Sequence, residues 1–409
     1  MTRLPGGREA VSAAIEALRG RAATISREIH AHPELPFREE RASALLSSWL
    51  EDEGFTVESG VADMPTAFVG RWGSGSPRIA VMAEYDALPG LGHGCGHNLI
   101  AAGGVLAAAA LRRAMAGSGA AGTLEVIGTP AEEGGGGKIL ELNAGVFDGI
   151  DGALMFHPAD RTILDRRMLA CVHLRITFRG VAAHAAKNPD LGKNALAAMV
   201  LFFTGVDALR QHVNDGARMH GIITDGGSAV NVVPDRSEAD FMVRHLTLAE
   251  VAVLRDRVTA VARGAALMTG TEVTVEETAP PYAHLESNGP MVDRLDLIMK
   301  ELGLSVEEAA PDDRTGSTDA GNVSLALPTV HPFMQVAPRG TPSHSVAFRE
   351  AAESDEAQDA MVDMATALAL LGWDLFDDSE LLASASSHWR SAAARRHADQ
   401  TTSEERKAF

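Results

Sequence analysis

Residues 79–98 read IAVMAEYDALPGLGHGCGHN, and this stretch decides the expected fold. It opens with the apolar run Ile79–Ala83, which predicts a short buried strand. It leads directly into Leu99–Met115, a long alanine-rich run that predicts a helix, and Thr123–Gly128 then predicts a second strand. A strand, a helix and a strand in this order are typical of a parallel sheet that helices flank.

The same alternation continues outward on both sides of this stretch. The other expected elements are, in chain order, helices over 9–33 and 38–53, a strand over Gly152–Phe156, a helix over Met291–Leu302, a strand over Thr329–Val336 and a helix over Glu350–Leu371. We therefore predict an α/β catalytic domain with a mostly parallel sheet.

Between residues 167 and 283 the order of elements changes. The expected elements there are strand Val172–Phe178, helix Asn194–Val213, strands Arg218–Ile223 and Ser237–Arg244, helix Leu248–Met268 and strand Thr271–Glu276. This β-α-β-β-α-β order is ferredoxin-like. We predict a catalytic domain whose first part is 1–166, an inserted α+β domain at 167–283, the second part of the catalytic domain at 284–376, and a C-terminal surface helix or tail at 377–409.

The composition excludes several classes of protein. With 36 Lys and Arg against 55 Asp and Glu, the formal net charge is −19, and such a chain repels nucleic acid and anionic lipid. We expect no membrane span, because no stretch approaches the roughly 18 apolar residues needed. Residues 1–18 lack the apolar region of a signal peptide, and two cysteines are too few for a secreted disulfide scaffold. We therefore expect a cytoplasmic protein.

Side chains that can ligate a metal follow the predicted strands. Cys95 and His97 come after the strand at 79–83, and Glu133, His157 and His344 come after three later strands. Cysteine, histidine and carboxylate are the ligands of a borderline-soft cation such as zinc. Because ligands bind at the carboxyl ends of strands in an open α/β sheet, these five residues are expected at one edge. A single histidine is more often structural, so the prediction rests on the group.

Two adjacent carboxylates, Glu132 and Glu133, point in different directions and can have different roles. One can ligate a metal while the other takes a proton from water that the metal activates. In the inserted domain, His184 could donate to an oxyanion, and Asn231 and Arg244 could hold a substrate carboxylate. A structural histidine and a surface ion pair are the alternatives for His184 and Arg244.

Five stretches together resemble the metal-dependent metallopeptidase and amidohydrolase family of the aminoacylases and glutamate carboxypeptidases. The stretches are 27–34, 84–98, 129–133, 181–189, and 316–322 with His344. The chain is most similar to the branch of p-aminobenzoyl-glutamate hydrolase and N-acyl amino acid amidohydrolases. The resemblance implies an enzyme that cleaves a C–N amide bond of a small molecule: an N-acyl amino acid, an aminobenzoyl-amino acid or a dipeptide, with a carboxylate.

The resemblance also implies cofactors and assembly. Two divalent metal ions, with zinc favoured and manganese or cobalt as alternatives, would be held by Cys95, His97, Glu133, His157 and His344. The inserted domain at 167–283 would be a lid and dimerisation domain in a homodimer.

Residue roles follow from the same resemblance. Glu132 would be the general base, Asp86 a support for a ligand, and His184 the donor to the transition state. His220 and Asn231 would contact the substrate.

The chain departs from many members of this family at one position. Those members have a metal-ligating histidine two residues before Asp86, where this chain has Glu84, and Cys95 is the natural replacement ligand. Two other functions stay open: hydrolysis of a specialised aryl amide or ureide on the same metals, and ligand binding without catalysis.

Overall fold

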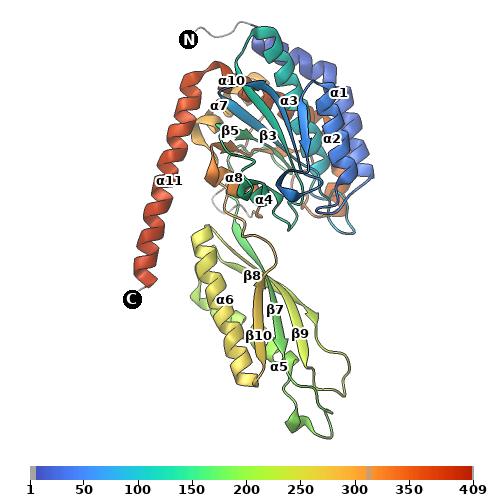
Figure 1. The fold of residues 1–409 in the computed structure, drawn as a ribbon, viewed down its shortest axis with the longest axis vertical. Helices are drawn as coiled ribbons and strands as arrows, with labels where there is room; N and C mark the ends of the chain where they lie inside the picture. The colour runs from blue at the N-terminus through green and yellow to red at the C-terminus, as the bar shows by residue number, and fades with distance from the viewer. Residues whose placement is uncertain (1–5, 311–312, 314, 408–409) are drawn as a thin grey trace. The chain divides into compact units, whose positions relative to one another are not determined.

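The computed structural model describes residues 6–310, 313 and 315–407, with the side chains of the last helix described as far as Arg396. The chain forms two compact units, drawn in Figure 1. The first contains Met1–Arg167, Leu285–Arg314 and Asn322–Phe409, and the second contains Met168–His284 and Thr315–Gly321. The short segment Thr315–Gly321 thus belongs to the second unit, whereas the sequence-based division placed it within 284–376.

The first unit is built on a six-stranded sheet with the order β1-β2-β4-β3-β5-β11. These strands are β1 (Thr56–Ser59), β2 (Phe68–Ser74), β3 (Arg78–Glu84), β4 (Gly122–Thr129), β5 (Gly152–Leu154) and β11 (Thr329–Val330). Strands β4, β3, β5 and β11 are parallel, and β2 and β1 add an antiparallel edge. The mostly parallel sheet is confirmed. The sequence analysis missed β1 and β2, because Gly70 and Gly73 weaken the strand pattern of β2.

Helices flank this sheet, as predicted (Figure 1). The α-helices described outside the stretch 170–277 are α1 (Gly7–Ala31), α2 (Glu40–Asp52), α3 (His97–Ser118), α4 (Gly137–Asn143), α7 (Gly289–Glu301), α8 (Ala320–Ala326), α9 (Val346–Ala351), α10 (Asp355–Asp377) and α11 (Ser379–Lys407). Helix α3 packs against α1, α10 and the sheet. A Cβ atom on Gly104 would lie 3.0 Å from the carbonyl oxygen of Met82, so this glycine allows the helix to approach the sheet.

Helix α3 corrects one expectation of the sequence analysis. It is long and apolar enough to cross a membrane by length and composition alone, although no such stretch was expected. However, 83% of its most apolar window is buried inside the protein, as in the core helix of a folded domain. The predicted strand Thr329–Val336 is also divided, into β11 and β12 (Phe333–Gln335), because Pro332 between them has no N–H to donate. Strand β12 pairs in parallel with β6 (His157–Ala159).

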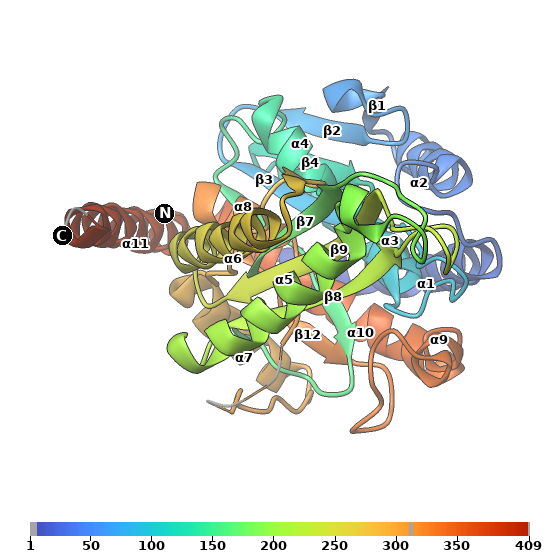
Figure 2. The same cartoon turned by 90° about the horizontal axis from the view of Figure 1, so that it is seen from below.

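The second unit has the predicted β-α-β-β-α-β order. Its elements are β7 (Ala170–Arg179), α5 (Ala195–Leu209), β8 (Arg218–Asp225), β9 (Arg236–His245), α6 (Leu248–Thr269) and β10 (Glu272–Glu277). The antiparallel sheet has the order β10-β7-β9-β8. Alternate residues of β7 and β9 are buried in one cluster with α5 and α6, so both helices cover the same face (Figure 2).

Candidate metal centre

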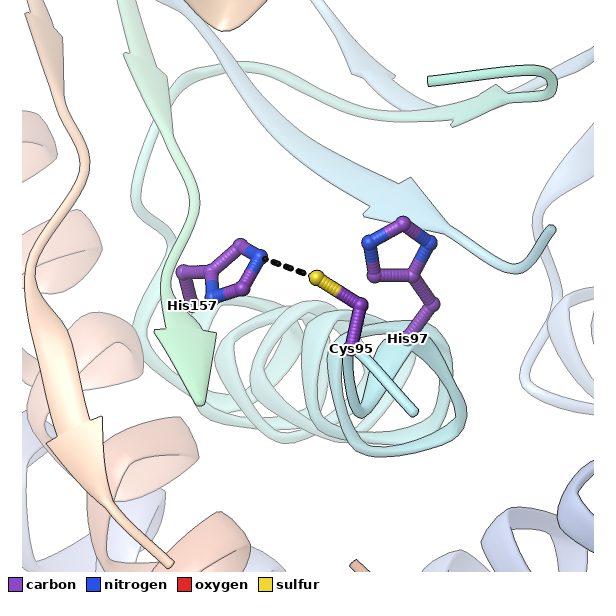
Figure 3. A group of neighbouring side chains, drawn as sticks. All are labelled: Cys95, His97 and His157. Carbon is purple, nitrogen blue, oxygen red and sulfur yellow. Dashed lines mark hydrogen bonds between the residues drawn. The ribbon is translucent and has the colours of Figure 1, made fainter. Parts of the chain in front are cut away.

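Three of the predicted ligands converge where the parallel strands end (Figure 3). Cys95 and His97 stand at the start of α3, in the loop that leaves β3, and His157 begins β6 just after β5. Cys95 Sγ lies 3.5 Å from His157 Nε2, and the His97 and His157 rings are 5.8 Å apart and perpendicular. The glycines at 94 and 96 allow this turn, since Gly96 has a φ of 79°.

The other two predicted ligands lie beside this group. His344 Nε2 is 3.1 Å from Glu133 Oε1, and candidate ligand atoms of Cys95, Glu133 and His344 lie within 4.8 Å of one another. The same holds for His97 with Glu132 and Glu133. The structure thus brings together all five residues that the sequence analysis named as ligands, along with the candidate base.

Hydrogen bonds orient two of the histidines toward the centre of this cluster. His97 Nδ1 is 3.0 Å from Asp86 Oδ1, and His157 Nδ1 is 2.7 Å from the carbonyl oxygen of Pro158. Since both partners are acceptors, each Nδ1 carries the proton and leaves the Nε2 lone pair for a cation. Asp86 Oδ2 also accepts the backbone N–H of Glu133 at 2.9 Å, so the same carboxylate orients a histidine and the glutamate loop.

The charges of the cluster compensate one another. Burial raises the pKa of the Cys95 thiol, but His157, followed by His344 and His97, outweighs burial and holds that pKa well below its ordinary value. Hydrogen bonds to Cys95 and Glu133 raise the pKa of His344 to about 10. Thiolate, carboxylate and imidazole groups therefore lie close together in the cluster, and their negative and positive charges offset one another.

This donor set fits a divalent metal. Two ligands of a tetrahedral zinc, at about 2.3 Å for sulfur and about 2.0 Å for nitrogen, lie roughly 3.5 Å apart. The observed separation of Cys95 Sγ and His157 Nε2 is 3.5 Å. His97 Nε2 is buried and has no hydrogen-bond partner among the described residues, which leaves its lone pair available.

A buried ion pair lies against the cluster, and the sequence analysis did not foresee it. Lys138 Nζ, in the first turn of α4, pairs with Glu84 Oε1, and both side chains are wholly buried. The other oxygen of Glu84 is 3.6 Å from His97 Nε2. A lysine that follows four glycines gives no sequence signal of burial, because its environment is made by distant segments.

His331 is a second residue that the sequence analysis missed. It follows β11, is wholly buried, and its ring lies 5.8 Å from that of His157. Burial, followed by the charge of His157, lowers the pKa of His331 to about 3, so this imidazole is neutral. The sequence analysis placed His331 inside the predicted strand Thr329–Val336, so its position gave no signal that it lies beside the cluster.

The predicted substrate contacts lie in the second unit. His184 and Asn231 are in neighbouring loops, since the Asn231 carbonyl oxygen accepts the N–H of Ala185 at 2.9 Å. His220 is on β8, and Arg244 on β9 donates to Ser317 Oγ at 2.7 Å. Burial, followed by the charge of Arg244, lowers the pKa of His220.

Comparison with known proteins agrees with this chemistry. The model of peptidase family M20/M25/M40 matches residues 80–369. The chain is 38% identical over 378 residues to a mouse Xaa-Arg dipeptidase, covering 88% of this chain and 87% of that protein. It is 41% identical over 279 residues to a polypeptide of the p-aminobenzoyl-glutamate hydrolase of Escherichia coli, covering 64% of this chain and 58% of that polypeptide.

Solved structures show the same fold. A dinuclear metal-binding peptidase of the M20 family from Bacillus subtilis superposes with a TM-score of 0.62 at 22% identity, covering 87% of this chain and 98% of that chain. The aminobenzoyl-glutamate utilization protein of Klebsiella pneumoniae gives a TM-score of 0.71 at 19% identity, covering 90% and 99%. The chain is therefore a metal-dependent hydrolase of linear amides, and it belongs to peptidase family M20/M25/M40.

Proposed function

We propose that this chain hydrolyses dipeptides and dipeptide-like amides that carry a free carboxylate, with two divalent metals held by Cys95, His97, Glu133, His157 and His344. The observation that carries this proposal is the convergence of five sulfur, nitrogen and oxygen donors at one edge of the sheet. The preference for dipeptides is supported by the Xaa-Arg dipeptidases of mouse and human, 38% and 34% identical over 87% of their length. Aminobenzoyl-glutamate is the second candidate, supported by the Escherichia coli relative.

When bound, the metals supply a Lewis acid that lowers the pKa of water and polarises the amide carbonyl. Glu132 is the general base, which accepts the proton of the attacking water and returns it to the leaving nitrogen. Glu132 is buried next to Glu133, so its carboxylate is shielded from bulk solvent. Asp86 keeps both His97 and the Glu133 backbone in place during this transfer.

His184 is the donor to the developing oxyanion. Its Nδ1 accepts the backbone N–H groups of Ala186 and Lys187 at 3.2 and 3.1 Å. The proton of a neutral imidazole is therefore on Nε2, which can donate a hydrogen bond. Arg244, with His220 and Asn231, binds the substrate carboxylate, since a guanidinium pairs with a carboxylate through two hydrogen bonds.

Zinc is the proposed metal, because thiolate and imidazole favour it, and manganese and cobalt are alternatives. The cytoplasm is the proposed location, supported by the two free cysteines, since thiols in the cytoplasm are kept reduced.

A homodimer through the second unit is the proposed assembly. It is supported by the free edge of β8 with Ile222 and Ile223, which are 66% and 44% exposed, and by Val200 on α5, which is 53% exposed.

The test is metal content measured together with chelator-reversible hydrolysis of dipeptides, p-aminobenzoyl-glutamate, N-acetyl amino acids, aryl amides and ureides. About two metals per chain, with turnover of Xaa-Arg dipeptides that chelator removes and zinc restores, is the expected result. Turnover of aryl amides or ureides, without turnover of dipeptides, would show that the substrate is an aryl amide or a ureide and not a dipeptide. Metal without turnover of any amide would favour a binding protein, and no metal after reconstitution would remove the proposed centre.

A further inference from the structure

Glu39 is a wholly buried carboxylate far from the metal ligands in sequence, and it is neither a candidate ligand nor the candidate base. It stands immediately before α2 and accepts three hydrogen bonds. Glu39 Oε1 accepts the backbone N–H of Phe37 at 2.8 Å and that of Ala131 at 2.9 Å. Glu39 Oε2 accepts the Thr66 hydroxyl at 2.8 Å. The Glu39 side chain therefore connects the segment before α2, which contains Phe37, to the loop that contains Ala131.

Both backbone N–H groups belong to residues in an unfavourable conformation. Phe37 has a φ of 64° and Ala131 a φ of 58°, in the left-handed region that residues with a Cβ avoid. This conformation brings the Cβ atom too close to the following carbonyl oxygen. It persists where surrounding contacts hold it, and such residues cluster at functional sites. Glu39 provides such a contact to both.

Ala131 directly precedes Glu132 and Glu133. Asp86 Oδ2 accepts the N–H of Glu133, and Glu39 Oε1 accepts the N–H of Ala131. Two buried carboxylates thus hold the residues on either side of Glu132. The Ala131 carbonyl oxygen also accepts the N–H groups of residues 135 and 136, so a change at Ala131 is transmitted along the whole loop.

The Phe37 side chain adds a second connection between the two loops. A Cβ atom on Gly135 would lie 2.6 Å from the Phe37 ring and 2.6 Å from the Ala131 Cβ, so ring, glycine and alanine are in close contact. The loop that contains Glu132 is therefore held from the N-terminal segment by packing as well as by hydrogen bonds.

We propose that Glu39 is a positioning residue that fixes the backbone on the N-terminal side of the general base Glu132. The proposal rests on the proposed function, which makes Glu132 the base. Among the described residues, no hydrogen bond or ion pair joins Glu39 to a candidate ligand, so Glu39 acts through Ala131. Since a misplacement of about 1 Å at a catalytic group can cost on the order of 100-fold in rate, loss of this contact lowers kcat.

The experiment compares E39Q, E39D and E39L in the full, metal-loaded chain. Glutamine keeps an oxygen for both backbone N–H groups, and its amide can donate to the Thr66 hydroxyl, so E39Q is expected to retain kcat within about threefold. E39D is one methylene shorter and E39L has no acceptor; both are expected to lose roughly 10- to 100-fold in kcat while KM and metal content stay near the wild-type values. If E39L does not fold, E39D still tests the proposal, because it keeps a carboxylate at this position.

Glu34 is the matched control. Its carboxylate accepts the backbone N–H groups of Arg41 and Ala42 at 3.0 and 2.9 Å, so it also holds the start of α2, and none of its described hydrogen bonds reaches residues 129–136. E34A is expected to lower the melting temperature and leave kcat unchanged. Wild-type kcat in both E39D and E39L would overturn the proposal. So would equal losses in E39Q and E39L, because the acceptor would then not be the cause.

Hydrogen–deuterium exchange of the backbone amides of residues 129–136 measures how firmly this loop is held, and it needs no substrate. Faster exchange there in E39D and E39L, but not in E39Q or E34A, is expected. Unchanged exchange overturns the proposal even where activity falls. If the wild type hydrolyses no amide, the proposed function fails, and the exchange measurement still decides whether Glu39 holds the loop.

Discussion

The buried carboxyl of Glu39 gives a prediction about stability whose size can be worked out. Burial, opposed by its backbone hydrogen bonds and reinforced by Asp86, raises the pKa of Glu39 from 4.5 to about 7. The folded state therefore favours the neutral acid, and the stability that this group contributes is fully present below pH 4.5. It is lost as the pH rises through 7, because the unfolded chain has already released the proton.

A pKa change of about 2.5, at 1.36 kcal/mol per unit, corresponds to about 3 kcal/mol between pH 4.5 and pH 8. E39Q does not titrate and can keep the three hydrogen bonds. Relative to E39Q, the wild type is therefore expected to lose about 3 kcal/mol of unfolding free energy over this range. All other titrating groups are common to both chains and cancel in the difference.

Urea unfolding followed by tryptophan fluorescence is the assay. All four tryptophans (Trp49, Trp72, Trp373 and Trp389) lie in the first unit, so the signal reports the unit that contains Glu39. Both chains are measured in the same metal state at pH 4.5, 6 and 8. A difference between them that does not change with pH, or one that grows in favour of the wild type as the pH rises, would refute the reasoning.

Four further predictions concern the candidate site. Glu132→Gln should retain both metals and lose about 10²- to 10⁴-fold in kcat; undiminished kcat, measured at equal metal content, would remove Glu132 as the base. Cys95 should be alkylated by iodoacetamide in the metal-free chain and protected by metal, and equal rates in the two states would contradict a thiolate ligand. K138M should lower the free energy of unfolding in urea by roughly 3–5 kcal/mol, because it leaves the buried carboxylate of Glu84 without its lysine partner. The double variant K138M/E84Q should regain most of that stability. If it regains none, the ion pair between Lys138 and Glu84 is not the cause of the loss. Arg244→Ala should raise KM for dipeptides with a free carboxylate but not for the corresponding C-terminal amides. An equal rise in KM for both would show that Arg244 does not bind the substrate carboxylate.

The predictable part of the fold depends on local patterns. The strand at 79–83 and the helix at 99–115 were recognisable because each is an uninterrupted apolar run, and they are found as β3 and α3. The candidate ligands could be named because chemistry and strand order both point to one sheet edge. Spacing along the chain does not distinguish the roles of Glu132 and Glu133, because adjacent glutamates give the same sequence signal.

The missed residues are those whose environment comes from distant segments. Lys138 and Glu39 would each be read as surface charges, because burial of a charge depends on partners that tertiary structure supplies, here Glu84 for one and the Ala131 backbone for the other. The division of the last predicted strand, by contrast, has a local cause in Pro332, which cannot donate a backbone hydrogen bond.

The connectivity of the first unit has a consequence for how the chain is made. Its core needs residues from both ends: β11 pairs with β5, and α10 packs against α3, where Gly103 contacts Met361. The sheet and both helices of the second unit come from the continuous stretch 170–277. During synthesis the second unit can thus close first, whereas the unit that begins the chain closes last. Until α10 emerges from the ribosome, the part of α3 that packs against α10 stays uncovered, and in this interval aggregation or chaperone capture competes with folding.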